Sequence, residues 1–157
     1  MQTLPIYNDL VFKMLFSRDP IILIDLLNSF PEFQRQKKIK KIKILNPILL
    51  PKRKNLKNTI LDIHAEDING NKFLIEMQSR AHDGFTERIL FNWAKLFSST
   101  LTQGVEYSEL PKVYSINFLN FSLAKEYPEY YFNFSILENS HPEIRLTESL
   151  SIVIIEL

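Results

Sequence analysis

The chain of 157 residues contains no cysteine, only three glycines and no long hydrophobic run. Without cysteine it has no disulfide framework and no thiolate metal site, which suits a reducing compartment. The sequence also shows no glycine-rich phosphate loop, no zinc-ligand spacing and no serine or cysteine triad. No apolar stretch approaches the roughly 20 residues that span a bilayer, so no membrane partner is expected.

The N-terminal residues, MQTLPIYNDLVFKMLF, lack the basic, then apolar, then small pattern of a signal peptide. We therefore expect a cytoplasmic protein. A hydrophobic content of 45% and a charged content of 24% are typical of a folded globular protein rather than a disordered one. The length is that of one domain, and we expect a single domain over residues 1–157.

Positive charge is concentrated in one segment although the formal net charge is only +1. Residues 35–57, here called the basic segment, hold ten basic residues and no acidic one, whereas residues 58–157 hold seven basic and fourteen acidic residues. One interpretation is a solvated face. The other interpretation is a surface that neutralises nucleic-acid phosphates. A predicted loop near the end of the basic segment would make part of these contacts. The basic side chains of that loop are Lys52, Arg53, Lys54 and Lys57.

Helix-start signals predict two short helices near the N-terminus. Asn8 is a suitable N-cap for a helix over Asp9–Ser17, and Asp19-Pro20 opens a second helix that ends near Phe30. Alternating isoleucine and lysine between Ile39 and Leu45 predicts an edge strand protected by charge.

A longer amphipathic helix is predicted from Phe85 to Gln103, with Gly104 as its C-cap. Its apolar face contains Phe85, Ile89, Leu90, Trp93, Phe97 and Leu101. Strands are predicted at residues 112–121, 127–136 and 152–155. Together these elements indicate a mixed α/β domain.

Residues 60–78, ILDIHAEDINGNKFLIEMQ, predict a β-hairpin around an Asn-Gly turn. Asp62 and His64 share one face of the first strand, and Glu76 and Gln78 share one face of the second. A tight turn centred on Asn69-Gly70 would place the two carboxylates on opposite faces. A three-residue loop over residues 68–70 would place Asp62 directly opposite Glu76.

The apolar pattern favours the three-residue loop. This loop gathers one continuous apolar face from both strands: Leu61, Ile63, Ala65, Phe73, Ile75 and Met77. Facing carboxylates repel each other across a sheet, whereas a divalent cation between them converts the repulsion into binding. The alternative is an exposed hairpin face that binds nothing.

Several motifs follow one another along nearly the whole chain: Asn8-Asp9-x-x-Phe12-Lys13-x-x-Phe16, Leu61-Asp62-Ile63, Asp67-x-x-Gly70, Ile75-Glu76-Met77-Gln78, Arg88, Ala94-Lys95-Leu96, Ser98-Ser99, Gly104-x-x-Tyr107 and Pro111-x-Val113-Tyr114-Ser115-Ile116. The spacing from Asp62 to Glu76-x-Gln78 resembles that of the PD-(D/E)XK nucleases. The full series resembles one branch of them, the recombination-promoting nuclease/putative transposase family.

The resemblance implies a restriction-endonuclease-like αβββαβ core, with a mixed central sheet flanked by helices, and Mg²⁺-dependent cleavage of DNA. Asp62 and Glu76 match the metal-binding acids, and Mn²⁺ is an alternative ion. Gln78 matches the position of the superfamily's lysine, and Asp9 matches an acid of the N-terminal helix that joins such sites. Asp9 is equally suited to a helix N-terminus for its charge alone.

The expected partner is DNA without strong sequence preference, and a homodimer is left open. Besides the basic segment, Arg88 and Lys95 are candidates for contacts to DNA, on a polar stripe that faces either the cleft or solvent. The family usually has an aromatic residue where Asn92 stands. The alternative function is a catalytically inactive nucleic-acid-binding or interaction module on the same fold. Relatives usually continue past the position of Leu157, so a shortened C-terminus is expected.

Overall fold

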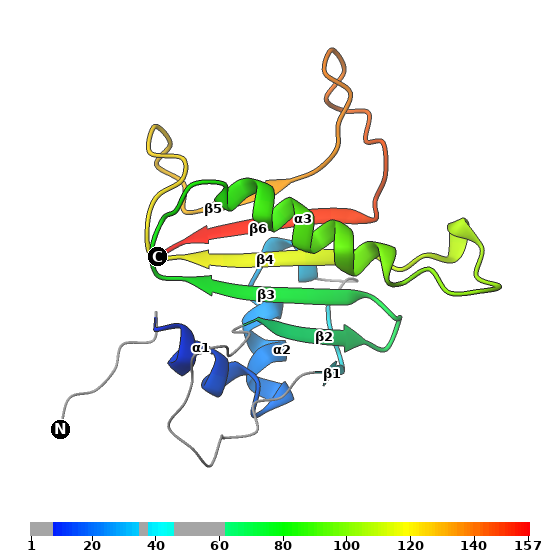
Figure 1. Cartoon of the computed structure of the whole chain (residues 1–157), viewed down its shortest axis with the longest axis horizontal. Helices are drawn as coiled ribbons and strands as arrows, with labels where there is room; N and C mark the ends of the chain where they lie inside the picture. Colours follow the sequence, from blue (N-terminus) through cyan, green and yellow to red (C-terminus); the bar gives the residue numbers. More distant parts are fainter. Residues whose placement is uncertain (1–7, 35–37, 46–61) are drawn as a thin grey trace.

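The computed structural model describes residues 8–34, 38–45 and 62–157. Its centre is a six-stranded mixed sheet with strand order β1-β2-β3-β4-β6-β5, which carries helices on both faces (Figure 1). The described elements are α1 (Asp9–Phe16), α2 (Pro20–Asn28), η1 (Pro31–Phe33), β1 (Ile42–Ile44), β2 (Ile63–Asp67), β3 (Lys72–Gln78), α3 (Phe85–Ser98), η3 (Tyr107–Glu109), β4 (Val113–Leu119), β5 (Tyr131–Phe134) and β6 (Leu150–Glu156).

The sheet combines antiparallel edges with a parallel centre. β1, β2 and β3 are antiparallel neighbours, whereas β3, β4 and β6 run parallel, and β5 is antiparallel to β6. β6 is buried along nearly its whole length, as expected for a parallel strand covered on both faces. The order α1–β1–β2–β3–α3–β4 is the predicted αβββαβ core, which confirms the predicted fold class.

The caps predicted for the first two helices are confirmed. The Asn8 side chain accepts hydrogen bonds from the backbone N–H groups of Leu10 and Val11, and the Asp19 side chain accepts one from that of Ile21. α2 ends at Asn28 rather than near Phe30. The Asn28 amide instead exchanges two hydrogen bonds of 2.8 Å with the Ile39 backbone, which ties the helix end to the segment before β1.

The predicted C-terminus of α3 was wrong. The helix ends at Ser98 with Ser99 as its C-cap, and Gly104 lies beyond it in a left-handed conformation with φ of 87°. The hydroxyl groups of Ser98, Ser99 and Thr100 donate to backbone carbonyls three residues earlier, which offers those carbonyls an alternative to continued helix. Leu90 and Leu101 of the predicted apolar face are exposed.

Each face of the sheet has its own hydrophobic core. α1 and α2 cover the face that includes Ile63, Phe73 and Ile75. α3 covers the other face through the buried side chains of Phe85, Ile89 and Trp93, which pack against residues of β4 and β6. The indole nitrogen of Trp93 donates to the Val113 carbonyl at 2.9 Å and so fixes α3 over β4.

The hairpin has the predicted three-residue loop. Ile63 pairs with Ile75, and Ala65 pairs with Phe73. In the same register, Asp62 lies opposite Glu76. Gly70 has φ of 80°, and the Asp67 N–H donates to the Asn71 carbonyl. Ile63, Ala65, Phe73, Ile75 and Met77 are all buried in the same core, as predicted. Leu61 lies outside the described residues.

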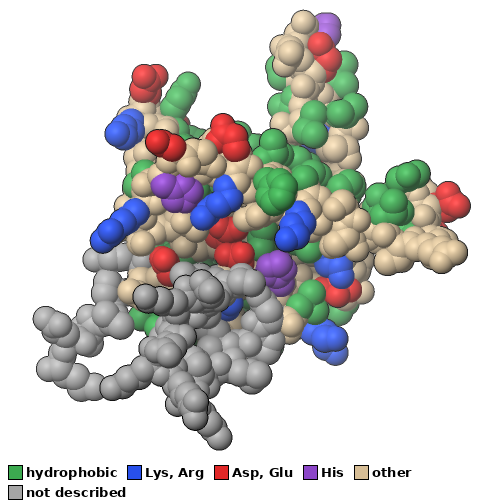
Figure 2. All heavy atoms as spheres, in the orientation of Figure 1, with side chains coloured by type: hydrophobic (Ala, Val, Ile, Leu, Met, Phe, Trp, Pro, Cys, Tyr) green, Lys and Arg blue, Asp and Glu red, His purple; other side chains and the backbone are tan. Residues whose placement is uncertain are grey.

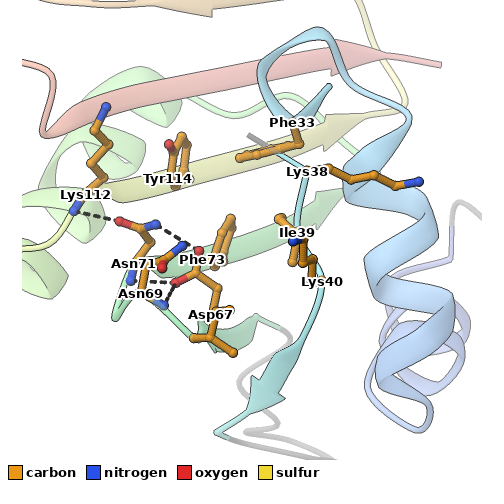
Figure 3. Close-up of a pocket in the computed structure, with 11 residues that line it drawn as sticks. Phe33, Lys38, Ile39, Lys40, Asp67, Asn69, Asn71, Phe73, Lys112 and Tyr114 are labelled. Atoms are coloured by element: carbon orange, nitrogen blue, oxygen red, sulfur yellow. Dashed lines mark hydrogen bonds between the residues drawn. The ribbon is translucent and has the colours of Figure 1, made fainter. Parts of the chain in front are cut away.

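The role of Asp67 is to stabilise this loop and not to bind a ligand. Its carboxylate accepts hydrogen bonds from the Asn69 N–H at 2.8 Å and from the Asn71 N–H and side-chain amide at 3.0 and 2.8 Å (Figure 3). The side-chain Oδ1 of Asn71 in turn accepts from the Lys112 N–H, which joins the loop to the start of β4. The loop borders a hollow of 330 Å³ whose aromatic wall is the Phe73–Tyr114 stack.

Candidate active site

Asp62 and Glu76 form a carboxylate pair at the C-terminal half of β3. The negative charge of Asp62 acts on Glu76 across the hairpin. Burial raises the pKa of Glu76, and the charge of Asp62 raises it further. Burial likewise raises the pKa of Asp62, although Lys13 and Arg88 oppose that shift. Ionisation of the pair is therefore unfavourable relative to exposed carboxylates, and Lys13 and Arg88 offset part of that cost.

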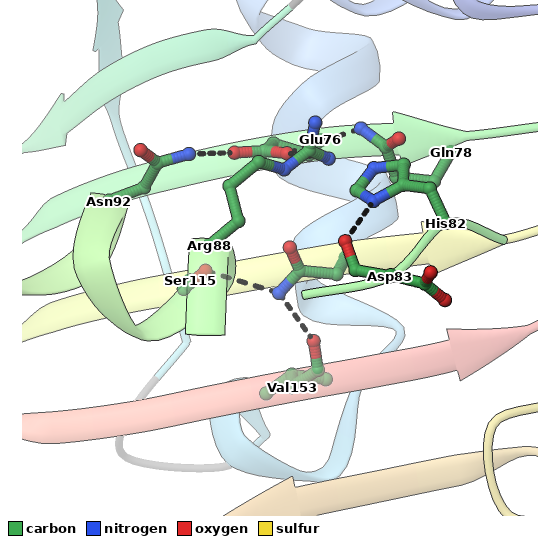
Figure 4. Close-up of polar contacts among 9 residues, drawn as sticks. Glu76, Gln78, His82, Asp83, Arg88, Asn92, Ser115 and Val153 are labelled. Carbon is green, nitrogen blue, oxygen red and sulfur yellow. Dashed lines mark hydrogen bonds and ion pairs between the residues drawn. The ribbon is translucent and has the colours of Figure 1, made fainter. Parts of the chain in front are cut away.

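Three side chains donate hydrogen bonds to the Glu76 carboxylate, which is only 2% exposed. Asn92 Nδ2 lies 3.0 Å from Oε1, while Gln78 Nε2 and Arg88 Nη2 lie 3.3 and 3.4 Å from Oε2 (Figure 4). Asn92 and Arg88 are four residues apart on α3, so both side chains project from one face of the helix toward β3. Arg88 and Asn92 of the polar stripe of α3 therefore face the site, whereas Lys95 of the same stripe is exposed.

A hollow of 320 Å³ lies beside the carboxylate pair. It is lined by Asp62, His64, Leu74, Asn92, Lys95, Leu96 and Ser99. Figure 2 shows this face of the molecule, where acidic, basic and histidine side chains lie close together. Of the predicted residues, Asp62 and the exposed Lys95 line this hollow, whereas Arg88 contacts Glu76.

The N-terminal helix contributes two more charged groups. α1 packs against β3 (Figure 1) and presents Asp9, Lys13 and Ser17 at intervals of four residues. Asp9 bonds to the Ser79 side chain just after β3, and burial raises its pKa. Its Oδ1 is buried and has no hydrogen-bond partner among the described residues. Asp9 therefore lies next to the end of β3.

Lys13 belongs to the family motif, but the sequence predicted no role for it. Its side chain is 4% exposed, and its positive charge acts on both Asp62 and His64. The signal that could have identified it is the spacing of Asp9, Lys13 and Ser17. Three polar residues on one stripe of an otherwise apolar helix indicate a polar environment on that side.

His64 is a half-buried member of the site. Burial lowers its pKa, and the nearby positive charge of Lys13 lowers it further. A neutral imidazole in the wall of the hollow is therefore favoured at neutral pH. Glu66, also on β2, pairs with Lys72 at 2.9 Å and belongs to the hairpin rather than to the site.

The predicted nucleic-acid surface includes residues outside the described part of the chain. Lys52, Arg53, Lys54 and Lys57 lie outside the described residues. The described members of the basic segment, Lys38, Lys40, Lys41 and Lys43, are all exposed. Their exposure agrees with both the solvated face and the phosphate-binding surface.

The donor set suits a hard cation that keeps most of its water. Within residues 8–34, 38–45 and 62–157, no group of three or more histidine, cysteine or acidic side chains could hold a metal. Mg²⁺ is usually bound through one or two carboxylates, with water and substrate phosphate oxygens completing its shell. Asp62 and Glu76 fit that requirement, and the charge of Asp62 adds to burial in raising the pKa of Glu76.

A mixed αβββαβ sheet with one carboxylate just before β2 and a facing one on β3 defines a restriction-endonuclease-like protein. The chain belongs to the PD-(D/E)XK nuclease family transposases, whose family model matches residues 6–157. No curated protein and no solved structure gives a match. In the part of the chain that the structure describes, no helix has the length and apolar character needed to span a membrane.

Proposed function

We propose that this protein is a metal-dependent DNA endonuclease of the transposase or recombination-promoting type. The observation that carries the proposal is the facing pair Asp62 and Glu76, held half-buried and buried beside an open hollow with Lys95 at its edge. Two mutually repelling carboxylates in one site cost stability, and a divalent cation bound between them would relieve that cost. Membership of the nuclease family supplies DNA as the substrate class.

Asp62 and Glu76 would hold Mg²⁺, or Mn²⁺ in its place. When bound, the ion supplies Lewis-acid stabilisation of the phosphate and a more acidic water. Gln78 lies within hydrogen-bond distance of Glu76, which keeps the metal-binding carboxylate oriented and places a neutral amide where a water can be positioned. Asn92 orients the other carboxylate oxygen.

Arg88 and Lys95 would bind the DNA backbone, together with the loop residues Lys52, Arg53, Lys54 and Lys57. Contacts to phosphates position the duplex without reading its sequence. We accordingly expect cleavage with little sequence preference. Asp9, beside the end of β3, would act as an additional acid of the site.

One observation favours the alternative of a non-catalytic nucleic-acid-binding module. Both oxygens of Glu76 already accept hydrogen bonds from Asn92, Gln78 and Arg88. A module without turnover would keep these bonds permanently, whereas a nuclease must exchange at least the Arg88 contact when it binds metal.

The deciding experiment is plasmid nicking by the full chain in Mg²⁺, Mn²⁺ or EDTA. We expect nicking with either metal and none in EDTA, and complete loss in Asp62→Ala and Glu76→Ala because each removes an anionic ligand. Glu66→Ala is the matched control, since its carboxylate lies on β2 but pairs with Lys72. Equal nicking in EDTA, or full activity of Asp62→Ala, would contradict the proposal. No nicking with any metal, combined with DNA binding, would favour the binding module.

A further inference from the structure

Lys13 is the basic residue whose position the proposed function does not yet explain. An ammonium group in a nearly buried position loses hydration, and that loss is tolerated only where an opposite charge compensates it. Lys13 is 4% exposed, while its helix neighbours Phe12 and Phe16 enter the hydrophobic core. The compensating charge comes from Asp62, one of the two proposed metal ligands.

The other positive charges near the carboxylate pair are differently engaged. Within the described residues, Arg88 and Lys95 accompany Lys13 around the site. Arg88 points at Glu76, with its Nη2 3.4 Å from Oε2. Lys95 is exposed and lies at the edge of the hollow. Of these three basic residues Lys13 is the buried one, and its burial fixes the position of its positive charge.

We infer that Lys13 contacts the phosphate group that is cleaved and stabilises its negative charge. This inference rests on the proposed function. A phosphodiester gains negative charge on its non-bridging oxygens as the attacking water adds, and a preorganised cation stabilises that charge most where water is excluded. Gln78 is neutral, so the C-terminal end of β3 provides no such charge. Lys13 provides it from α1, which packs against the same strand. It neither gives nor takes a proton in this role.

The test uses Lys13→Met, which keeps the length and apolar stem of the side chain but removes its charge. Lys112→Met is the matched control, because Lys112 lies at the opposite end of the parallel strands and pairs with Glu148 at 3.5 Å. We expect Lys13→Met to slow cleavage by about 100-fold or more, whereas Lys112→Met changes it little. Lys13→Gln, which keeps a polar group beside Asp62, serves as a second variant should Lys13→Met fold poorly.

Two further measurements separate a phosphate contact from an indirect effect on the metal. The affinity for Mn²⁺, measured by calorimetry without DNA, should be unchanged or higher in Lys13→Met because a nearby positive charge is gone. The double variant Lys13→Met/Gln78→Lys should recover much of the lost cleavage, since it restores a charge from β3. A loss of Mn²⁺ affinity that parallels the loss of cleavage would overturn the inference and show that Lys13 acts by keeping Asp62 ionised.

DNA binding in EDTA distinguishes failure of this inference from failure of the proposed function. We expect Lys13→Met to lower the slope of log affinity against log salt for a short duplex by about 0.9, the value for one lost phosphate contact. If wild type binds DNA but never cleaves it, the endonuclease fails while the slope still tests Lys13. An unchanged slope, full cleavage by a folded Lys13 variant, or no DNA binding by wild type would each overturn the inference.

Discussion

Arg88 Nη2 lies 3.4 Å from Glu76 Oε2, so a guanidinium group approaches the carboxylate that is proposed to bind metal. The Arg88 Nε is buried and has no hydrogen-bond partner among the described residues. The side chain is thus held at the site by one ion pair and by its contact with the Phe85 ring, at 5.6 Å from the ring centroid. Arg88 and a divalent cation compete for the same carboxylate oxygen.

Removing this guanidinium should therefore strengthen metal binding. We expect Arg88→Gln to bind Mn²⁺ several-fold more tightly than wild type in calorimetry, while its affinity for DNA falls because a phosphate contact is lost. Arg145→Gln is the control, since Arg145 pairs with Glu148 at the same distance of 3.4 Å and has similar exposure. Weaker Mn²⁺ binding by Arg88→Gln would instead show that Arg88 holds Glu76 in its binding orientation.

The stability of the metal-free protein should depend on pH through Glu76. Because its pKa is raised in the folded state above the ordinary value of 4.5, the folded protein holds this proton more tightly than the unfolded chain. Ionisation therefore destabilises the fold, and this contribution grows as the pH rises above about 4.5.

The measurement is the melting temperature of wild type and Glu76→Gln in EDTA at a series of pH values from about 4.5 upward. Relative to wild type, we expect Glu76→Gln to gain stability as the pH rises, by about 2–4 °C for each kcal/mol of relieved cost. Glu66→Gln, which loses an ion pair with Lys72, should show no such gain. A gap between wild type and Glu76→Gln that stays constant with pH would contradict the assignment.

Substitutions of Asp67 and Asp62 should have opposite effects on stability and on cleavage, although Asp67 ends β2 and Asp62 directly precedes this strand. Asp67→Ala removes three hydrogen bonds within the hairpin loop and should cost about 1–3 kcal/mol of unfolding free energy, with cleavage by the folded fraction retained. Asp62→Ala should abolish cleavage with a smaller change in stability. Chemical denaturation and nicking assays on both variants test this contrast. Loss of cleavage by folded Asp67→Ala would place Asp67 in the site.

The four basic residues near the end of the basic segment can be tested by substitution. Replacing Lys52, Arg53, Lys54 and Lys57 with alanine should weaken DNA binding for all sequences alike. Each lost phosphate contact should lower the slope of log affinity against log salt by about 0.9. The control is Lys112→Ala, at the start of β4. An unchanged slope would mean that the loop is a solvated surface.

The sequence by itself determined the local features of this protein. Asn8 and Asp19-Pro20 specify helix starts because a cap requires only neighbouring backbone N–H groups. The hairpin register followed from alternation along two adjacent strands and from the glycine that the loop requires. Since register decides which side chains face each other, the pairing of Asp62 with Glu76 was predictable before any tertiary contact was known.

Only the tertiary structure decided what surrounds that pair. Asn92 and Arg88 reach Glu76 from 16 and 12 residues away, after α3 has crossed over the sheet, and Lys13 reaches Asp62 from a different helix. The sequence showed the polar stripe on α3 but not whether it faced the sheet or solvent. The reason is physical: alternation fixes the faces of a strand, whereas the side that a helix buries depends on packing against elements distant in the chain.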